Sequence, residues 1–248
     1  MADDHRFFQA TELTTATYDQ IARNYAERNA ATRSHWAERM EQFVELLREN
    51  EERRPLPELG RPGDDATLAE YLMLVPVLDA GCGPGRDARA LAEYDLPVLA
   101  CDISQGMLDA AGENTPRRLR RGSVRYALMD MRRLELPNAS VRGVWCSASL
   151  LHLPHKVAPR AVAELARVSR AGAPLVVLLK QANGGETERY EPYPFTDVIT
   201  PRFFAYYTEE QARTLLEDAG LAVIEVIVAP DQRGPGLPGW ISLVARKP

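Results

Sequence analysis

From residue 74 onward, short apolar runs alternate with amphipathic segments. The expected strands are 75–80, 97–101, 124–128, 141–147, 175–179, 221–228 and 240–245. The expected helices, which follow most of these strands, are 86–94, 105–114, 156–169 and 209–219. This alternation is typical of βαβ units, in which helices cover both faces of a parallel sheet. Because the Pro/Gly-rich connection 229–239 contains no helix, we expect the last two strands to be antiparallel neighbours.

Two amphipathic helices are expected before the sheet. The first carries an apolar stripe at helical spacing, formed by Tyr18, Ile21, Ala22 and Tyr25. The second carries a similar stripe, formed by Trp36, Met40, Phe43, Val44 and Leu47. Residues 51–65 combine charges with three prolines and two glycines, which indicates a linker. We therefore expect a helical lid and linker over 1–70 and an α/β core over 71–248.

Composition and charge exclude several classes of protein. Of the 248 residues, 45% are apolar and 26% are charged, which is the balance of a globular chain. The net charge of −5 argues against a nucleic acid or an acidic membrane surface as partner. The acidic start MADDHRFF is unlike a signal peptide, and no apolar run is long enough to cross a bilayer. Three dispersed cysteines form no CxxC pair. We expect a cytoplasmic protein with reduced thiols and no metal, a monomer or a homodimer.

A glycine-rich segment leaves the first expected strand and predicts a ligand site there. Gly81, Gly83 and Gly85 alternate after Asp79, so the backbone can turn tightly and approach a ligand closely. A dinucleotide fingerprint, GxGxxG, would place its last glycine at Arg86. The GxGxG spacing therefore favours a ligand that contains a nucleoside but no diphosphate.

The tips of the next two expected strands supply polar and apolar groups for such a ligand. Asp102 ends the second strand, where a carboxylate can accept hydrogen bonds from both ribose hydroxyls. Ile103 and Met107 offer apolar surface to an adenine ring. After the third strand, Asp130 is placed to accept from an adenine amino group, and Met131 to pack on the ring.

Four segments at these positions resemble the successive motifs of one family. They are DAGCGPGRDARAL (79–91), ACDISQGMLDAA (100–111), ALMDMRRLELP (127–137) and GVWCSASLLHLPH (143–155). They are similar to the motifs of class I S-adenosylmethionine-dependent methyltransferases of the small-molecule type. The resemblance implies a Rossmann-like, seven-stranded, mostly parallel sheet in the order 3-2-1-4-5-7-6, with strand 7 antiparallel. It also implies S-adenosylmethionine as cofactor, with S-adenosylhomocysteine as product, and places Asp79 and Gly81 by the methionine moiety.

Methyl transfer from a sulfonium needs alignment and exclusion of water, and it needs a base only where the acceptor atom carries a proton. In this fold the segment that starts at Ser147, at the end of the fourth strand, faces the methyl donor. His152 is the best candidate base because imidazole titrates near neutral pH, although it could instead shape the loop. The resemblance places Tyr25 at the methionine end or the substrate, with core packing as the alternative.

Residues 183–207 are expected to form a substrate cap rich in aromatic side chains and arginine. Aromatic faces and guanidinium groups suit a planar or carboxylate-bearing small molecule. The candidate substrate contacts are Tyr190, Arg202, Phe203 and Tyr206. A surface flap packed on the core by its own aromatic rings is the alternative.

The sequence therefore predicts an S-adenosylmethionine-dependent methyltransferase that moves a methyl group to an O, N or C atom of a small organic molecule. One alternative is a non-catalytic protein that binds S-adenosylmethionine in the same pocket. The other is a nicotinamide-dependent oxidoreductase, which the glycine spacing disfavours.

Overall fold

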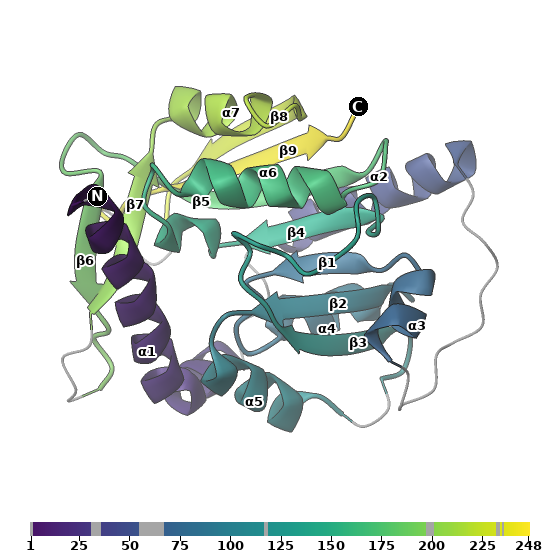
Figure 1. Cartoon of the computed structure of the whole chain (residues 1–248), viewed down its shortest axis with the longest axis horizontal. Helices are drawn as coiled ribbons and strands as arrows, with labels where there is room; N and C mark the ends of the chain where they lie inside the picture. The colour runs from purple at the N-terminus through teal and green to yellow at the C-terminus, as the bar shows by residue number, and fades with distance from the viewer. Residues whose placement is uncertain are drawn as a thin grey trace.

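A twisted, mostly parallel sheet forms the centre of the chain in a computed structural model (Figure 1), which describes residues 2–30, 36–54, 67–116, 119–196, 201–231, 234 and 236–248. Its main strands are β1 (Val77–Ala80), β2 (Pro97–Asp102), β3 (Ser123–Leu128), β4 (Gly143–Ser147), β5 (Pro174–Gln181), β8 (Ala222–Ala229) and β9 (Trp240–Arg246). They lie in the order β3-β2-β1-β4-β5-β9-β8, and β9 runs antiparallel to both β5 and β8. The predicted order and the predicted antiparallel strand are confirmed.

The sheet has two strands that the sequence analysis did not predict. These are β6 (Glu188–Pro192) and β7 (Pro201–Tyr207), which pair antiparallel with each other inside the expected substrate cap. The end of β7 also pairs with the end of β5, through Lys180 with Tyr206 and Gln181 with Tyr207. The expectation of seven strands was therefore too low, and part of the cap is a continuation of the sheet. Residues 197–200 of the cap lie outside the described residues.

Helices cover both faces of the sheet. The helical elements are α1 (Ala2–Ala30), α2 (Ala37–Arg53), α3 (Leu68–Met73), α4 (Arg86–Ala92), α5 (Gln105–Asn114), the 3-10 turn η1 (Leu150–His152), α6 (Ala158–Val168) and α7 (Glu209–Glu217). Apolar side chains of α3, α6 and α7 share one buried cluster with the sheet, and those of α2, α4 and α5 share another. The arrangement is a three-layer αβα domain, as βαβ connections require.

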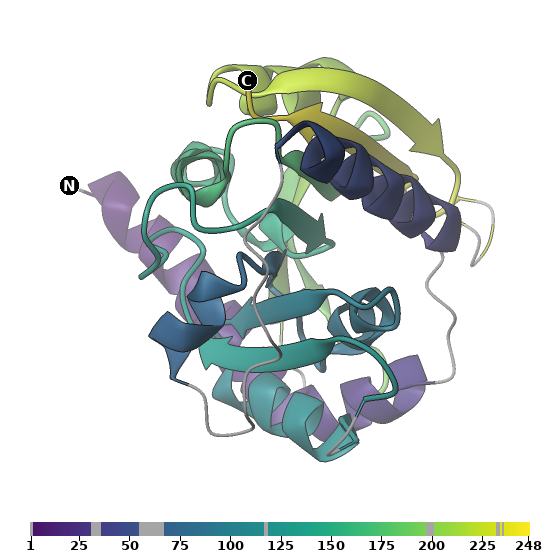
Figure 2. The same cartoon turned by 90° about the vertical axis from the view of Figure 1, so that its right-hand side faces the viewer.

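Helix α2 covers the sheet and is part of its core. Figure 2 shows α2 in front of the sheet, beside β8 and β9. Phe43 and Leu47 are buried there, and each contributes roughly 2–3 kcal/mol by leaving water. Gly143 of β4 allows this close approach, because a Cβ there would lie 2.7 Å from Leu47 Cδ2 and 3.0 Å from Phe43 Cζ. The expected linker follows α2, and its residues 55–66 lie outside the described residues.

Helix α1 crosses the carboxyl ends of the strands, between α5 and β7 (Figure 1). Asp19 Oδ1 accepts hydrogen bonds from Ser104 Oγ (2.6 Å) and the Gly106 amide (2.9 Å), at the start of α5. Toward β7, Thr14 Oγ1 accepts from the Phe203 amide (2.9 Å) and Thr17 Oγ1 donates to the Pro201 carbonyl (2.9 Å). These bonds hold α1 over the edge of the sheet where the glycine-rich loop begins.

The three cysteines, Cys82, Cys101 and Cys146, are buried and free of disulfide bonds. Within the described ranges, none of the helices combines the length and the apolar character needed to span a membrane.

Candidate active site

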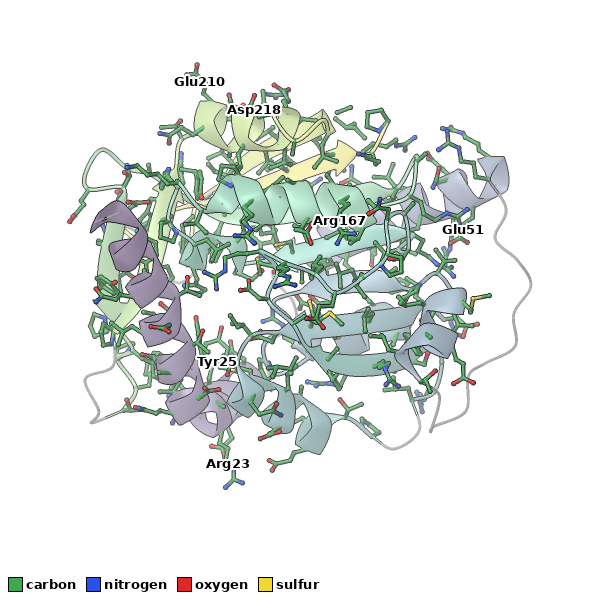
Figure 3. The ribbon with its side chains drawn as sticks, in the orientation of Figure 1. Arg23, Tyr25, Glu51, Arg167, Glu210 and Asp218 are labelled. Carbon is green, nitrogen blue, oxygen red and sulfur yellow. The ribbon has the colours of Figure 1, made fainter. Side chains whose placement is uncertain are left out.

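A pocket lies at the carboxyl ends of β1, β2 and β4, beneath α1. Its empty volume is about 1120 Å³, open solvent at its mouth included. The pocket wall includes most of the predicted site residues, which are Tyr25, Asp79, Gly81, Gly83, Asp102, Ile103, Met107, Asp130, Met131, Ser147 and His152. Figure 3 shows Arg23 of α1 extending away from the molecule, whereas Tyr25 of the same helix lies on its inner side. Gly85 and the four predicted substrate contacts are not part of the wall.

The three glycines of the loop after β1 differ in what surrounds them. All three have positive φ, +74° at Gly81, +52° at Gly83 and +73° at Gly85. A Cβ at Gly81 would lie 2.2 Å from Ser149 Cβ, and one at Gly85 would lie 2.3 Å from Tyr126 Oη. A Cβ at Gly83 would meet no protein atom within 4 Å, although Gly83 lines the pocket. Gly81 and Gly85 are therefore required by packing, and Gly83 is the one whose missing side chain leaves room for a ligand.

Asp79 presents a buried carboxylate with an unused acceptor. Its side chain is 1% exposed, and Oδ2 has no hydrogen-bond partner in the part of the chain that the structure describes. Burial raises the pKa of Asp79 well above its ordinary value, and the neighbouring carboxylates of Asp87 and Asp102 raise it further. A buried acceptor without a partner is costly, so a donor or a cation from a ligand would be stabilised here.

Asp102 at the tip of β2 holds the glycine-rich loop in place. Its Oδ2 accepts from the Gly83 amide (2.8 Å), and its Oδ1 accepts from the Ser104 amide (2.9 Å). Ser104, and not Asp102, is the N-cap of α5, because its side chain accepts from the Met107 amide. Burial raises the pKa of Asp102, while these amides favour its charged form. The carboxylate keeps lone pairs that can accept from ribose hydroxyls.

The predicted adenine contacts all line the pocket. Ile103 is 38% exposed and Met107 is buried. The Asp130 carboxylate is already engaged, because it pairs with Arg132 Nη2 (2.6 Å) and accepts from the Arg132 amide (2.8 Å). Arg132 also donates to Thr11 of α1 (3.3 Å). Asp130 therefore links the end of β3 to α1 as well as facing the pocket.

His152 and Tyr18 form a hydrogen-bonded pair at the wall of the pocket. His152 Nδ1 lies 2.7 Å from the Phe203 carbonyl oxygen, which can only accept, so Nδ1 carries the hydrogen. In the neutral ring Nε2 is then the acceptor, and Tyr18 Oη donates to it at 2.8 Å. Burial lowers the pKa of His152 to about 4, with the Phe203 carbonyl opposing this shift and Arg202 adding to it. Burial also raises the pKa of Tyr18.

The four predicted substrate contacts lie on the β6–β7 hairpin beside this pair. Tyr190 is 46% exposed and meets the buried Phe203 ring edge-on. Tyr206 donates to Glu191, whose carboxylate also accepts from Arg189. The Arg202 guanidinium lies over the rings of Tyr18, Tyr193 and Phe204.

Sequence reasoning missed one complete face of α1. Thr11, Thr14, Thr15 and Tyr18 all line the pocket. Their spacing of i, i+3, i+4 and i+7 is that of a single helical stripe, so the signal was present in the sequence. Tyr18 was assigned to an apolar core stripe, and the threonines were not considered. Arg86 and Asp87, which follow the last glycine of the loop, also line the pocket.

Comparison with known proteins identifies the central part of the chain. Residues 77–172 match the family model described as "Methyltransferase domain". An O-methyltransferase, cnsE, of Penicillium expansum is 29% identical in an alignment of 175 residues, and the match covers 66% of this chain and 60% of that protein. A malonyl-[acyl-carrier protein] O-methyltransferase of Serratia marcescens is 37% identical over 112 residues, which are 45% of this chain and 40% of that protein. The chain thus spans less than two thirds of the length of these curated relatives.

Solved structures share the fold. An S-adenosylmethionine-dependent methyltransferase from Methanosarcina mazei aligns with a TM-score of 0.60 and 20% identity, over 68% of this chain and 91% of that one. Magnesium protoporphyrin IX methyltransferase from Synechocystis PCC 6803, with bound S-adenosylhomocysteine, aligns with a TM-score of 0.60 and 16% identity, over 95% of this chain and 100% of that one. Residues 77–172 are thus similar to a methyltransferase domain, and the chain shares its fold with S-adenosylmethionine-dependent methyltransferases.

Proposed function

We propose that the chain transfers a methyl group from S-adenosylmethionine to a small organic molecule. The observation that carries this proposal is the unpartnered Oδ2 of Asp79, buried at the pocket beside a loop whose Gly83 leaves open space. An ammonium group can pair with this oxygen, and the amino acid moiety of S-adenosylmethionine carries an ammonium group. The relatives named as O-methyltransferases favour oxygen as the acceptor atom.

The remaining contacts follow from the positions of the strand tips. Asp102 would hold the ribose hydroxyls, while Ile103 and Met131 would pack against adenine near Asp130. Ser147, at the tip of β4, would lie at the methyl end. When bound, the cofactor supplies a methyl carbon that is already activated by the sulfonium. The residues of this chain therefore have to bind, orient and exclude water.

His152 acts through Tyr18 in this proposal. Because Tyr18 occupies the lone pair of His152 Nε2, an acceptor reaches the imidazole only by way of the phenol oxygen. An acceptor that carries a proton would give it to Tyr18 Oη as Tyr18 gives its own proton to Nε2. Tyr25 stands edge-on to Tyr18, with ring centroids 5.6 Å apart, and it also lines the pocket.

Calorimetric titration with S-adenosylmethionine, S-adenosylhomocysteine and NADH tests the cofactor assignment. We expect the first two compounds to bind the chain and NADH to leave it unchanged. Asp79→Asn should weaken binding of both sulfur compounds, since it removes the charge that an ammonium group pairs with. Failure of S-adenosylmethionine to bind the wild type would remove the proposal.

Turnover distinguishes an enzyme from a protein that only binds the cofactor. Incubation with labelled S-adenosylmethionine and a metabolite extract should give a labelled product that is heavier by one CH₂ group. Cofactor binding without any labelled product would favour the non-catalytic alternative.

A further inference from the structure

Arg202, near the start of β7, is the arginine of the β6–β7 hairpin for which the described residues show no ion pair. In the part of the chain that the structure describes, it forms no ion pair, and its Nε is buried without a hydrogen-bond partner. The other arginine of the hairpin, Arg189, pairs with Glu191 at 2.7 Å. Because a partly buried charge is costly until it is paired, Arg202 has an unused capacity to bind an anion.

Aromatic rings surround the Arg202 guanidinium and form no ion pair with it. Its Cζ lies 5.1 Å from the ring centroid of Tyr193, 5.1 Å from that of Phe204 and 5.8 Å from that of Tyr18. Such cation–π contacts orient the planar group and leave its full charge in place. Glu191 faces Arg202 in the β6–β7 register and feels its charge, because Arg202 helps to lower the pKa of Glu191, but the Glu191 carboxylate makes its hydrogen bonds with Arg189 and Tyr206.

This cation adjoins the candidate active site. Arg202 Nη1 lies 3.5 Å from Tyr18 Oη, which in turn is bonded to His152 Nε2. Tyr18 and His152 both line the pocket, at the end bounded by α1 and η1. An anionic group that reaches Arg202 would therefore lie next to the residues proposed to face the methyl acceptor.

We propose that Arg202 anchors a carboxylate of the methyl acceptor, so that the acceptors of this chain are carboxylate-bearing small molecules. The inference rests on the proposed methyltransferase function and adds the class of its substrate. A carboxylate matches the planar fork of a guanidinium through two parallel hydrogen bonds. Its single negative charge would also pair with the guanidinium of Arg202, and the aromatic rings around Arg202 suit a flat molecule.

Benzoate and its uncharged analogue benzamide test this anchor. Each is titrated into the chain saturated with S-adenosylhomocysteine, at neutral pH, and binding is measured by ligand-detected NMR. We expect benzoate to bind at least about tenfold more tightly than benzamide, because a hydrogen bond to a charged group is the stronger kind. Arg202→Gln should abolish this preference, and Arg202→Lys should restore part of it by restoring the charge without the fork.

Arg213→Gln is the matched control, because Arg213 lies on α7, pairs with Glu217 at 3.6 Å and is not part of the pocket wall. It should keep the full preference for benzoate. Equal binding of the two probes, no binding of benzoate, or a preference that survives Arg202→Gln would each overturn the anchor. These results leave the cofactor assignment standing as long as S-adenosylhomocysteine binds. If Arg202→Gln fails to fold, the wild type and Arg202→Lys decide the question.

Discussion

Gly83→Ala separates the binding of a ligand from the stability of the glycine-rich loop. A Cβ at this position meets no protein atom within 4 Å, and Gly83 lines the pocket. The backbone φ of +52° costs an L-residue roughly 1–2 kcal/mol, so the variant should melt several degrees lower, at about 2–4 °C per kcal/mol for a chain of this size. When S-adenosylmethionine is bound against the loop, the added methyl group would press on atoms of the ligand. Overpacking of this kind costs roughly 1–3 kcal/mol. The Kd for S-adenosylmethionine should therefore rise roughly 5- to 150-fold.

Two other glycines provide the controls. Gly220 also has a positive φ, +76°, and a Cβ there meets nothing within 4 Å, but it lies beyond α7 and away from the pocket wall. Gly220→Ala should lower the melting temperature similarly and leave the Kd unchanged. Gly81→Ala should destabilise the fold more than either, since its Cβ would lie 2.2 Å from Ser149 Cβ.

Melting curves of the three variants give their melting temperatures, and calorimetric titration gives their Kd values for S-adenosylmethionine. If Gly83→Ala binds S-adenosylmethionine as tightly as Gly220→Ala does, the loop does not contact the ligand. The reasoning that places the cofactor against it is then wrong.

Three further changes test the rest of the site. Asp102→Asn should raise the Kd for S-adenosylmethionine at least roughly tenfold in calorimetry, because the amide loses the charge and has one oxygen, which can accept from only one of the Gly83 and Ser104 backbone amides. Tyr18→Phe should lower kcat roughly a hundredfold with an acceptor that loses a proton, and an unchanged kcat would remove the proton path through His152. Burial lowers the pKa of His152 to about 4 in the folded chain, whereas the ordinary value is about 6.5. As the pH falls below about 6.5, the imidazole of His152 therefore becomes protonated in the unfolded chain before it does in the folded one. Stability should therefore fall between about pH 6.5 and 4, by up to about 1.4 kcal/mol per pH unit, and melting curves of His152→Gln should show a smaller loss.

The order of the sheet and the cofactor side of the pocket were predictable because both depend on local patterns. A strand buried on both faces carries an uninterrupted apolar run, as residues 175–179 of β5 do. The ends of parallel strands meet at one edge of the sheet, so Asp79, Asp102 and Asp130 could be expected to lie together. The structure places all three in the pocket wall.

The β6–β7 hairpin was not predictable in the same way. Polar and apolar residues alternate poorly in its two strands, ERYEP and PRFFAYY. The aromatic residues of this segment are equally compatible with a surface flap. What makes them strands is pairing with each other and with the end of β5. Pairing of this kind depends on partners elsewhere in the chain, and β propensity alone does not specify it.

The predictable part of the site is the part proposed to bind the cofactor, and the unpredictable part is the one proposed to bind the methyl acceptor. The residues proposed to hold the cofactor lie between Asp79 and Ser147, inside the segment 77–172 that matches the methyltransferase domain. Tyr18 and Arg202, which we place at the acceptor, lie outside that segment. Their positions depend on bonds between distant parts of the chain, such as that from the Phe203 amide to Thr14. The proposal for the cofactor therefore rests on the matched segment 77–172. The proposal for the acceptor site rests on the contacts between α1 and β7 in this chain.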